Sequence, residues 1–217
     1  IRDRARAVPL TLELGGMSQW VWRGAQLADA VTVRPAASVP VGESDLYLIA
    51  RGGFAISDRD LYEAVDRIEL IADYRWSAPL KIPLSVRAGF REYLFPNGPD
   101  GSEHTEEAYV GGHLGLTYLS ASLTVFQDFN VFDGTYAKIG VSPFLSILPG
   151  LDLRLEYAMA KYESSLRFND LTATGKYWIP LVPIVDLGVE AGFSISNAGI
   201  YDENKNFWGG ATVRISL

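Results

Sequence analysis

Acidic and basic side chains occur at every second position over several stretches of this sequence. The clearest is 151–160, where Asp152, Arg154 and Glu156 alternate with apolar residues. Because side chains two positions apart on a β-strand share a face, these carboxylates and guanidinium groups would gather on one surface. Guanidinium groups pair with planar oxyanions, so this pattern favours either anion binding or a network of internal ion pairs.

Residue types that perform covalent or acid–base catalysis are scarce. The chain has two histidines and no cysteine. His104 lies in an acidic stretch that we expect to form a loop, whereas His113 lies on the charged face of an expected strand, with Ser85 or Ser122 on its neighbours. No spacing identifies a nucleophile, a base and an orienting group, and no metal, nucleotide or haem motif occurs. We therefore predict no enzyme activity, no catalytic residues, no metal and no cofactor.

Composition narrows the class of protein. The 217 residues carry a net charge of −7, with 21% charged and 48% hydrophobic residues. This charge argues against nucleic acid as a partner, and the hydrophobic fraction argues against disorder. No apolar run approaches the roughly 20 residues that a transmembrane helix requires. No linker divides the chain, so we predict one domain over 1–217, in which 1–8 form a short periplasmic N-terminal segment.

Two-residue alternation recurs along the whole chain and predicts about twelve β-strands. Each is roughly 9 to 13 residues long, the length that a tilted strand needs to cross a bilayer. The predicted strands cover 10–23, 31–41, 45–57, 67–76, 84–94, 108–118, 121–129, 135–147, 151–162, 171–179, 186–196 and 207–217.

The predicted connections alternate between short and long. Short turns are expected at 40–44, 77–83, 119–120, 148–150 and 180–183, and longer acidic loops at 58–66, 96–107, 164–170 and 197–206. Short periplasmic turns and longer extracellular loops are typical of membrane barrels. Because the longest loop has only about a dozen residues, we predict no sizeable plug and expect side chains alone to narrow the lumen.

An even strand count without a covering helix predicts an all-β fold, a transmembrane antiparallel up-and-down β-barrel of about 12 strands. A soluble, lipocalin-like barrel with its apolar face inside is the alternative, because alternation does not fix the orientation. Strand length and the ratio of 14 arginines to 5 lysines favour the membrane orientation. Aromatic residues near strand ends favour it too, as a girdle at the level of the lipid headgroups. They are Trp20, Trp22, Tyr74, Trp76, Tyr118, Tyr177 and Phe207.

Three stretches resemble bacterial outer-membrane barrels: Ser18-Gln-Trp-Val-Trp-Arg-Gly24, Asp66-Arg-Ile-Glu-Leu-Ile-Ala-Asp-Tyr74 and Phe207-Trp-Gly-Gly. The first is similar to the Tyr/Trp-x-Trp-Arg-Gly motif in the first strand of TorF-like porins. This resemblance implies a bacterial outer-membrane location, with outer-membrane lipids and lipopolysaccharide as partners. The sequence departs from the pattern at Leu217, where such barrels usually end on an aromatic residue.

In the membrane orientation the charged face lines the lumen. The candidates for solute selection there are Arg51, Arg75, Arg87, Arg91, Arg154, Lys176, Arg214, Glu69, Asp73, Glu156 and Glu190. Arg23, Arg34, Arg67 and Lys138 share the same parity. An excess of basic groups predicts a narrow passive, porin-like channel for small polar or anionic solutes. The alternative is a structural barrel, closed by its own ion pairs, that anchors or docks other envelope proteins.

Overall fold

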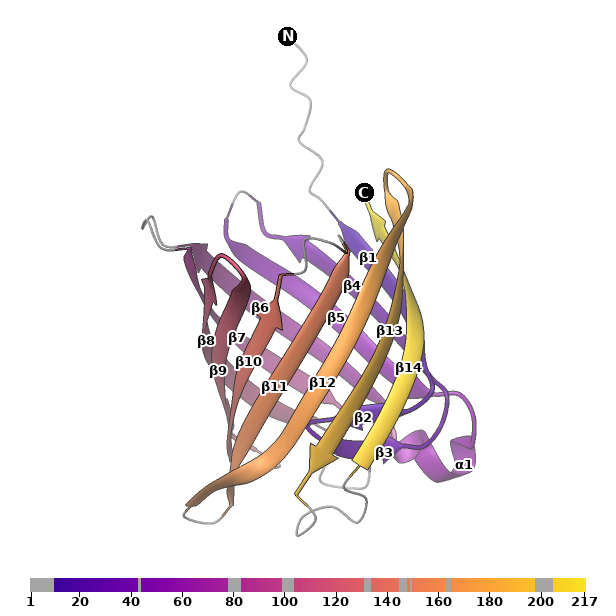
Figure 1. The fold of residues 1–217 in the computed structure, drawn as a ribbon. Helices are drawn as coiled ribbons and strands as arrows, with labels where there is room; N and C mark the ends of the chain where they lie inside the picture. Colours follow the sequence, from indigo (N-terminus) through magenta and orange to yellow (C-terminus); the bar gives the residue numbers. More distant parts are fainter. Residues whose placement is uncertain are drawn as a thin grey trace.

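The described part of the chain forms fourteen β-strands, one short α-helix and one short 3-10 helix. The computed structural model describes residues 10–42, 44–77, 83–98, 104–130, 134–144, 148, 150–162, 165–197 and 205–217. Twelve strands close into a barrel, and the other two pair only with each other (Figure 1). The predicted all-β fold with twelve barrel strands is confirmed. No helix in the described part of the chain is long and apolar enough to cross a membrane.

All neighbouring barrel strands are antiparallel, and β1 closes the ring by pairing with β14 on one edge and β4 on the other. The strands are β1 (Thr11–Met17), β4 (Thr32–Pro40), β5 (Leu46–Ala55), β6 (Arg67–Ser77), β7 (Leu84–Leu94), β8 (His104–Gly115), β9 (Leu119–Asp128), β10 (Thr135–Pro143), β11 (Leu151–Tyr162), β12 (Ser165–Val182), β13 (Val185–Ser196) and β14 (Lys205–Ser216).

The outer face of the barrel is apolar. Leu14 of β1 is 59% exposed, Val110 of β8 55% and Leu155 of β11 50%, and nearly every other barrel strand also exposes a large apolar side chain. A belt of this extent far exceeds the apolar patches that soluble monomers expose. The alternation therefore places apolar residues outside and charged residues inside, and the lipocalin-like alternative, with an apolar interior, is wrong.

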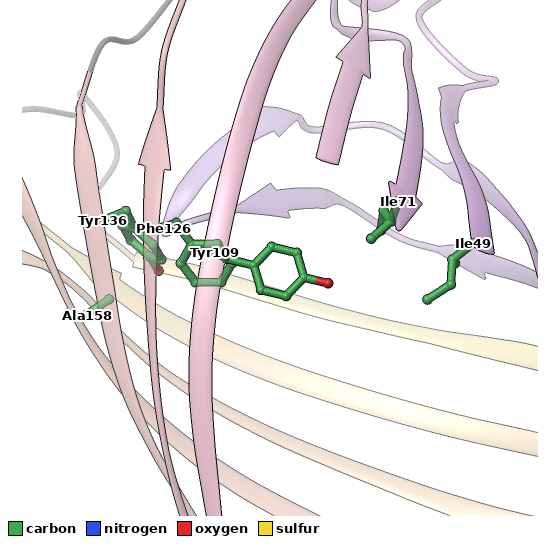
Figure 2. Packing of buried hydrophobic residues seen from close by; sticks show 6 residues of the cluster. All are labelled: Ile49, Ile71, Tyr109, Phe126, Tyr136 and Ala158. Carbon is green, nitrogen blue, oxygen red and sulfur yellow. The ribbon is translucent and has the colours of Figure 1, made fainter. Parts of the chain in front are cut away.

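The inner wall carries a band of aromatic and aliphatic side chains between the charged residues. Tyr109, Phe126 and Tyr136 lie on the adjacent strands β8, β9 and β10. The ring centroids of Tyr109 and Phe126 are 5.7 Å apart, and those of Phe126 and Tyr136 are 5.8 Å apart. Ile49 and Ile71 continue it on β5 and β6 (Figure 2). These rings are buried inside a polar lumen, and the charged side chains of the lumen pack against them.

The two ends of the barrel differ. Leu10 and the C-terminal residue Leu217 lie at one end, joined by reciprocal backbone hydrogen bonds (Figure 1). At the opposite end lie α1 (Arg59–Tyr62) and η1 (Glu63–Val65), in a connection predicted as an acidic loop. Some predicted boundaries are wrong: β8 begins at His104, which was expected in a loop, β12 includes most of the predicted 164–170 loop, and the turn between β8 and β9 lies at 116–118.

The first predicted strand, 10–23, is wrong over its second half. Strand β1 ends at Met17, and the chain then leaves the barrel wall to form the hairpin β2 (Trp20–Trp22) and β3 (Ala25–Ala28). Arg23 and Gly24 form its two-residue turn with φ of 51° and 78°. Positive φ at both central positions defines the type I′ turn, and its twist matches that of a tight hairpin.

Hairpin formation corrects two further predictions. Trp20 is 2% exposed and its ring lies against Gly53 of the inner wall, and Trp22 stacks edge-to-face on Tyr93 of β7. Neither tryptophan belongs to an outer aromatic girdle. The prediction that only side chains narrow the lumen is also wrong, because a segment of main chain folds into it.

Replacing Gly53 with valine should expel Trp20 from the inner wall. A Cβ at position 53 would lie 2.5 Å from the Trp20 ring, an overlap that costs about 1–3 kcal/mol of stability. We expect more efficient quenching of tryptophan fluorescence by iodide than in the wild type. Gly112→Val is the control, since nothing lies within 4 Å of a Cβ there; equal quenching in both variants would contradict the placement of Trp20.

Candidate functional site

The β2–β3 hairpin crosses the lumen from one wall to the other. At its base Trp20 touches β5, and near its tip Trp22 touches β7. The turn residues Arg23 and Gly24 reach the far wall, where β12 and β14 receive them: Asn169 Nδ2 donates to the Arg23 carbonyl at 2.7 Å and Asn206 Nδ2 to the Gly24 carbonyl at 3.1 Å. A segment that contacts opposite walls must span the bore between them.

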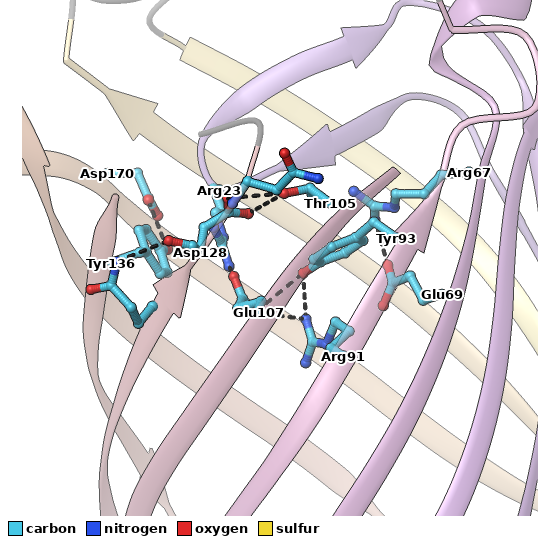
Figure 3. Close-up of polar contacts among 12 residues, drawn as sticks. Arg23, Arg67, Glu69, Arg91, Tyr93, Thr105, Glu107, Asp128, Tyr136 and Asp170 are labelled. Atoms are coloured by element: carbon cyan, nitrogen blue, oxygen red, sulfur yellow. Dashed lines mark hydrogen bonds and ion pairs between the residues drawn. The ribbon is translucent and has the colours of Figure 1, made fainter. Parts of the chain in front are cut away.

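Arg23 is the anchor of the hairpin. Its guanidinium forms an ion pair and hydrogen bond with Glu107 of β8 (Figure 3). The same group lies 4.5 Å from the ring centroid of Tyr136 and 5.3 Å from that of Phe126. Burial opposes the charged form of Arg23, but the ion pair with the buried carboxylate of Glu107 compensates for it. The anchor therefore stays charged.

Next to the hairpin, four arginines surround one carboxylate. Glu69 on β6 interacts electrostatically with Arg34, Arg51, Arg67 and Arg91, which lie on β4, β5, β6 and β7. Among the described residues, only Arg67 forms a direct ion pair with it, Nη2 to Oε1 at 2.7 Å. Arg91 also lies 3.8 Å from Glu107, so two carboxylates face the four arginines, and this arginine cluster carries an excess of positive charge. Cations so close together attract anions strongly where the dielectric constant is low.

Several donors of the arginine cluster lack protein acceptors. Nη1 of Arg67 and Nε of Arg91 are buried without a hydrogen-bond partner, and no ion pair involves Arg34 or Arg51 in the described ranges. All four arginines line a cavity of 370 Å³ beside the hairpin. Arg34 and Arg51, which form no ion pair with the described residues, line this cavity with side chains that are suited to binding an oxyanion.

Asp73 holds a second group of charges together. In the register of β6 and β7, Arg75 lies directly opposite Arg87, a pairing that like charges disfavour. Asp73 compensates for it, because its carboxylate accepts from Arg75 Nε at 2.7 Å and lies 3.5 Å from Arg87 Nε. Tyr109 donates a further hydrogen bond at 2.6 Å. This group also has one positive charge in excess.

Glu156 has the same role on the opposite wall. Lys138 Nζ and Arg154 Nη2 each lie 2.9 Å from its Oε1 atom. Two further pairs are balanced, Arg214 with Glu13 at 2.7 Å and Lys176 with Glu190 at 3.4 Å. The lumen thus contains both neutral pairs that brace the wall and clusters with unmatched positive charge.

All eleven predicted selectivity residues belong to this inner wall. Glu69, Arg51 and Arg91 belong to the arginine cluster, and the others belong to the two carboxylate-centred groups and the balanced pairs. Their role in selecting a solute stays a prediction. Of the predicted girdle, Tyr74, Trp76, Tyr118, Tyr177 and Phe207 are exposed on the outside.

Sequence reasoning missed Glu107, Tyr93 and the hairpin that they hold. Glu107 was assigned to a loop, although it lies in β8 and is fully buried. The signal available was Gly24, because glycine suits the second central position of a type I′ turn. The continuing tryptophan alternation before it concealed the turn.

The two histidines form no catalytic arrangement within the described residues. The register places His113 opposite Ser85 and Ser122, but no hydrogen bond joins it to either in the described part of the chain. His104 begins β8 at the rim. Among the described residues no group of three His, Cys, Asp or Glu side chains could hold a metal ion.

Comparison with known proteins finds likeness in fold only. No protein-family model and no curated protein matches the sequence. The solved KdgM porin is similar with a TM-score of 0.64 at 15% identity, over 95% of this chain and 99% of that one. A KdgM porin in complex with disordered oligogalacturonate gives 0.60 at 16%, over 97% and 99%, and the NanC porin gives 0.59 at 11%, over 96% and 98%. Identities this low show a shared barrel fold and leave the resemblance to TorF-like porins untested.

Replacing Asp73 with alanine should destabilise the barrel strongly. Its carboxylate is fully buried, and removing it leaves Arg75, Arg87 and Tyr109 without their shared partner, at a cost of about 3–5 kcal/mol. The free energy of unfolding in urea, in lipid vesicles, measures this. Asp152→Ala is the matched control, because Asp152 has no ion pair among the described residues. A loss of similar size in both variants would contradict the bridging role of Asp73.

Proposed function

We propose that this protein is a bacterial outer-membrane β-barrel that forms a narrow, passive channel for small anionic solutes. The observation that carries the proposal is the arginine cluster, four guanidinium groups around the single carboxylate of Glu69 beside a cavity in the lumen.

The apolar belt supports a membrane location. It surrounds a closed barrel with no free strand edge, which is the form of β-structure that a bilayer tolerates. Exposed aromatic residues lie on the same outer face, including Tyr74, Trp76, Tyr177 and Phe207. Such residues favour the interface between lipid and water. The similar folds of the KdgM and NanC porins agree with this location.

Consecutive cavities support a path through the barrel. The 370 Å³ cavity beside the hairpin and a 640 Å³ cavity nearer the short turns share Thr174 and Glu190 in their linings. A third cavity, of 180 Å³, shares Arg34, Arg51 and Glu190 with the first. These shared lining residues make the three cavities neighbours within the lumen.

The charge along this path supports anionic solutes. The arginine cluster and the groups around Asp73 and Glu156 each hold more cations than carboxylates. One of the similar structures is a KdgM porin in complex with oligogalacturonate, a ligand whose sugar units bear carboxylates. A solute of that chemistry would find unpartnered guanidinium donors in this lumen.

A closed structural barrel that anchors or docks other envelope proteins is the second candidate. The hairpin inside the lumen favours it, together with the balanced pairs Arg214–Glu13 and Lys176–Glu190 that brace the wall. The two functions differ in one measurement. Reconstitution of the refolded protein in a planar bilayer under a salt gradient should give discrete conductance steps with a reversal potential that shows anion preference. A stably inserted barrel without conductance would contradict the channel.

Removing the unpaired arginines should reduce the anion preference. In Arg34→Gln/Arg51→Gln the lumen loses two positive charges without breaking an ion pair of the described residues. Fixed charge in a narrow cleft changes local ion concentrations by factors of roughly 10 to 1000, so we expect the ratio of anion to cation permeability to fall at least about twofold. Reversal potentials measure this ratio. Arg59→Gln, at the rim, is the control and should leave it unchanged.

A charge on the outer belt should destabilise the barrel in lipid. Leu155→Arg places a guanidinium on the outer face of β11, where lipid contact costs about 2–4 kcal/mol near the middle of the bilayer. Leu61→Arg is the control, because Leu61 is 76% exposed on α1, beyond the barrel strands. Urea unfolding in vesicles compares the two. A neutral Leu155→Arg variant would show that this face does not contact lipid.

A further inference from the structure

The β2–β3 hairpin is structurally separate from the barrel that contains it. Its two strands form a sheet of their own, and the barrel closes without them through β1, β4 and β14. Within the described residues, neither β2 nor β3 pairs with a barrel strand through a ladder of backbone hydrogen bonds. Removing the hairpin from the lumen would therefore leave every strand pairing of the barrel intact.

The tip of the hairpin is held mainly by polar contacts, whereas its base packs in a buried apolar cluster. Arg23 pairs with Glu107, and two side-chain amides, Asn169 and Asn206, donate to the turn carbonyls. At the base, the guanidinium of Arg67 lies 5.0 Å from the ring centroid of Trp20 and 4.9 Å from that of Trp22. Polar contacts of this kind can exchange for contacts with water or with a solute, whereas a buried apolar core cannot.

The anchor is connected to the arginine cluster. Glu107 lies 3.8 Å from Arg91 Nη1 as well as beside Arg23, and Arg91 Nη1 donates to Tyr93 at 2.7 Å (Figure 3). Tyr93 in turn stacks with Trp22 of the hairpin. An anion that binds the arginine cluster would therefore contact Arg91, which shares the Glu107 carboxylate with the hairpin anchor Arg23.

We propose that the β2–β3 hairpin is a displaceable closure of the lumen, held in place by the Arg23–Glu107 ion pair, which we call the latch. The hairpin controls which solutes pass the loop end of the barrel, the end at which α1 lies. This proposal rests on the channel function proposed above. With the latch formed, the hairpin spans the bore and limits passage. With the latch broken, it moves away from the walls and the bore opens to the width of the twelve-stranded barrel.

Breaking the latch is the first test. Arg23→Gln removes the charge of the anchor and keeps a polar side chain of similar length. Losing a charged hydrogen bond shifts an equilibrium by roughly tenfold or more, so the time spent in a high-conductance state should rise by about that factor in planar bilayers. Arg59→Gln is the matched control, because its ion pair with Asp66 lies outside the hairpin. Unchanged gating in Arg23→Gln would overturn the proposal.

Weakening the contact of the tip with the far wall is the second test. Asn206 Nδ2 donates to the Gly24 carbonyl at 3.1 Å, and Asn206→Leu removes this donor while keeping a side chain of similar size. Losing one neutral hydrogen bond should raise the time spent in the high-conductance state by about fivefold. Unchanged gating in Asn206→Leu would show a fixed hairpin and overturn the proposal.

A readout without current separates this proposal from the channel function. Thr174 lines the cavities behind the hairpin, so Thr174→Cys reports access from the loop end to a membrane-impermeant thiol reagent added outside intact cells. Labelling should accelerate roughly tenfold when Arg23→Gln is added. Faster labelling without conductance would support the closure and contradict the channel. Equal labelling rates would overturn the closure whatever the conductance.

Discussion

Repulsion among guanidinium groups clustered on the inner wall is the interaction on which the rest of the structure depends. Charges facing a narrow lumen repel one another when their signs match, and the register places Arg75 opposite Arg87 and gathers four arginines around Glu69. Shared carboxylates at Asp73 and Glu156 reduce this repulsion without cancelling it. In the proposed channel, the remaining local positive charge would favour anions over cations, which a fully paired wall would not do.

Aromatic rings make this arrangement of cations possible. Arg23, Arg87 and Arg91 lie over the rings of the inner band, at 4.5 to 5.7 Å from the centroids of Tyr109, Phe126, Tyr136 and their neighbours. The face of an aromatic ring attracts a cation, and it also shields the apolar carbons of the arginine side chain from water. The band in Figure 2 therefore replaces the hydrophobic core of a soluble protein and orients the charged groups of the lumen at the same time.

The packing of the hairpin within the lumen bears directly on its proposed role as a closure of the channel. Its base packs with Ala28, Ala30 and Ala55 against the η1 connection, while its tip depends on polar contacts with the far wall. Gly24 at the tip has φ of 78° and would place a Cβ 2.5 Å from Asp170 Cβ, so only glycine fits this contact. An apolar hinge with a polar tip is the division of contacts that a movable element requires.

Strand count, strand alternation and the inward direction of the charged residues could be predicted from the sequence, because a period of two leaves each side chain only two faces and lipid tolerates only one of them. The alternation at Asp152, Arg154 and Glu156 predicted that charged side chains line the lumen. It could not show that Trp20 and Trp22 turn inward, since the same period continues through a hairpin that leaves the wall. Nor could it bring Arg23 to Glu107 or place four arginines around Glu69. Those contacts join strands far apart in the sequence, and only the closure of the barrel and the register of its strands decide them.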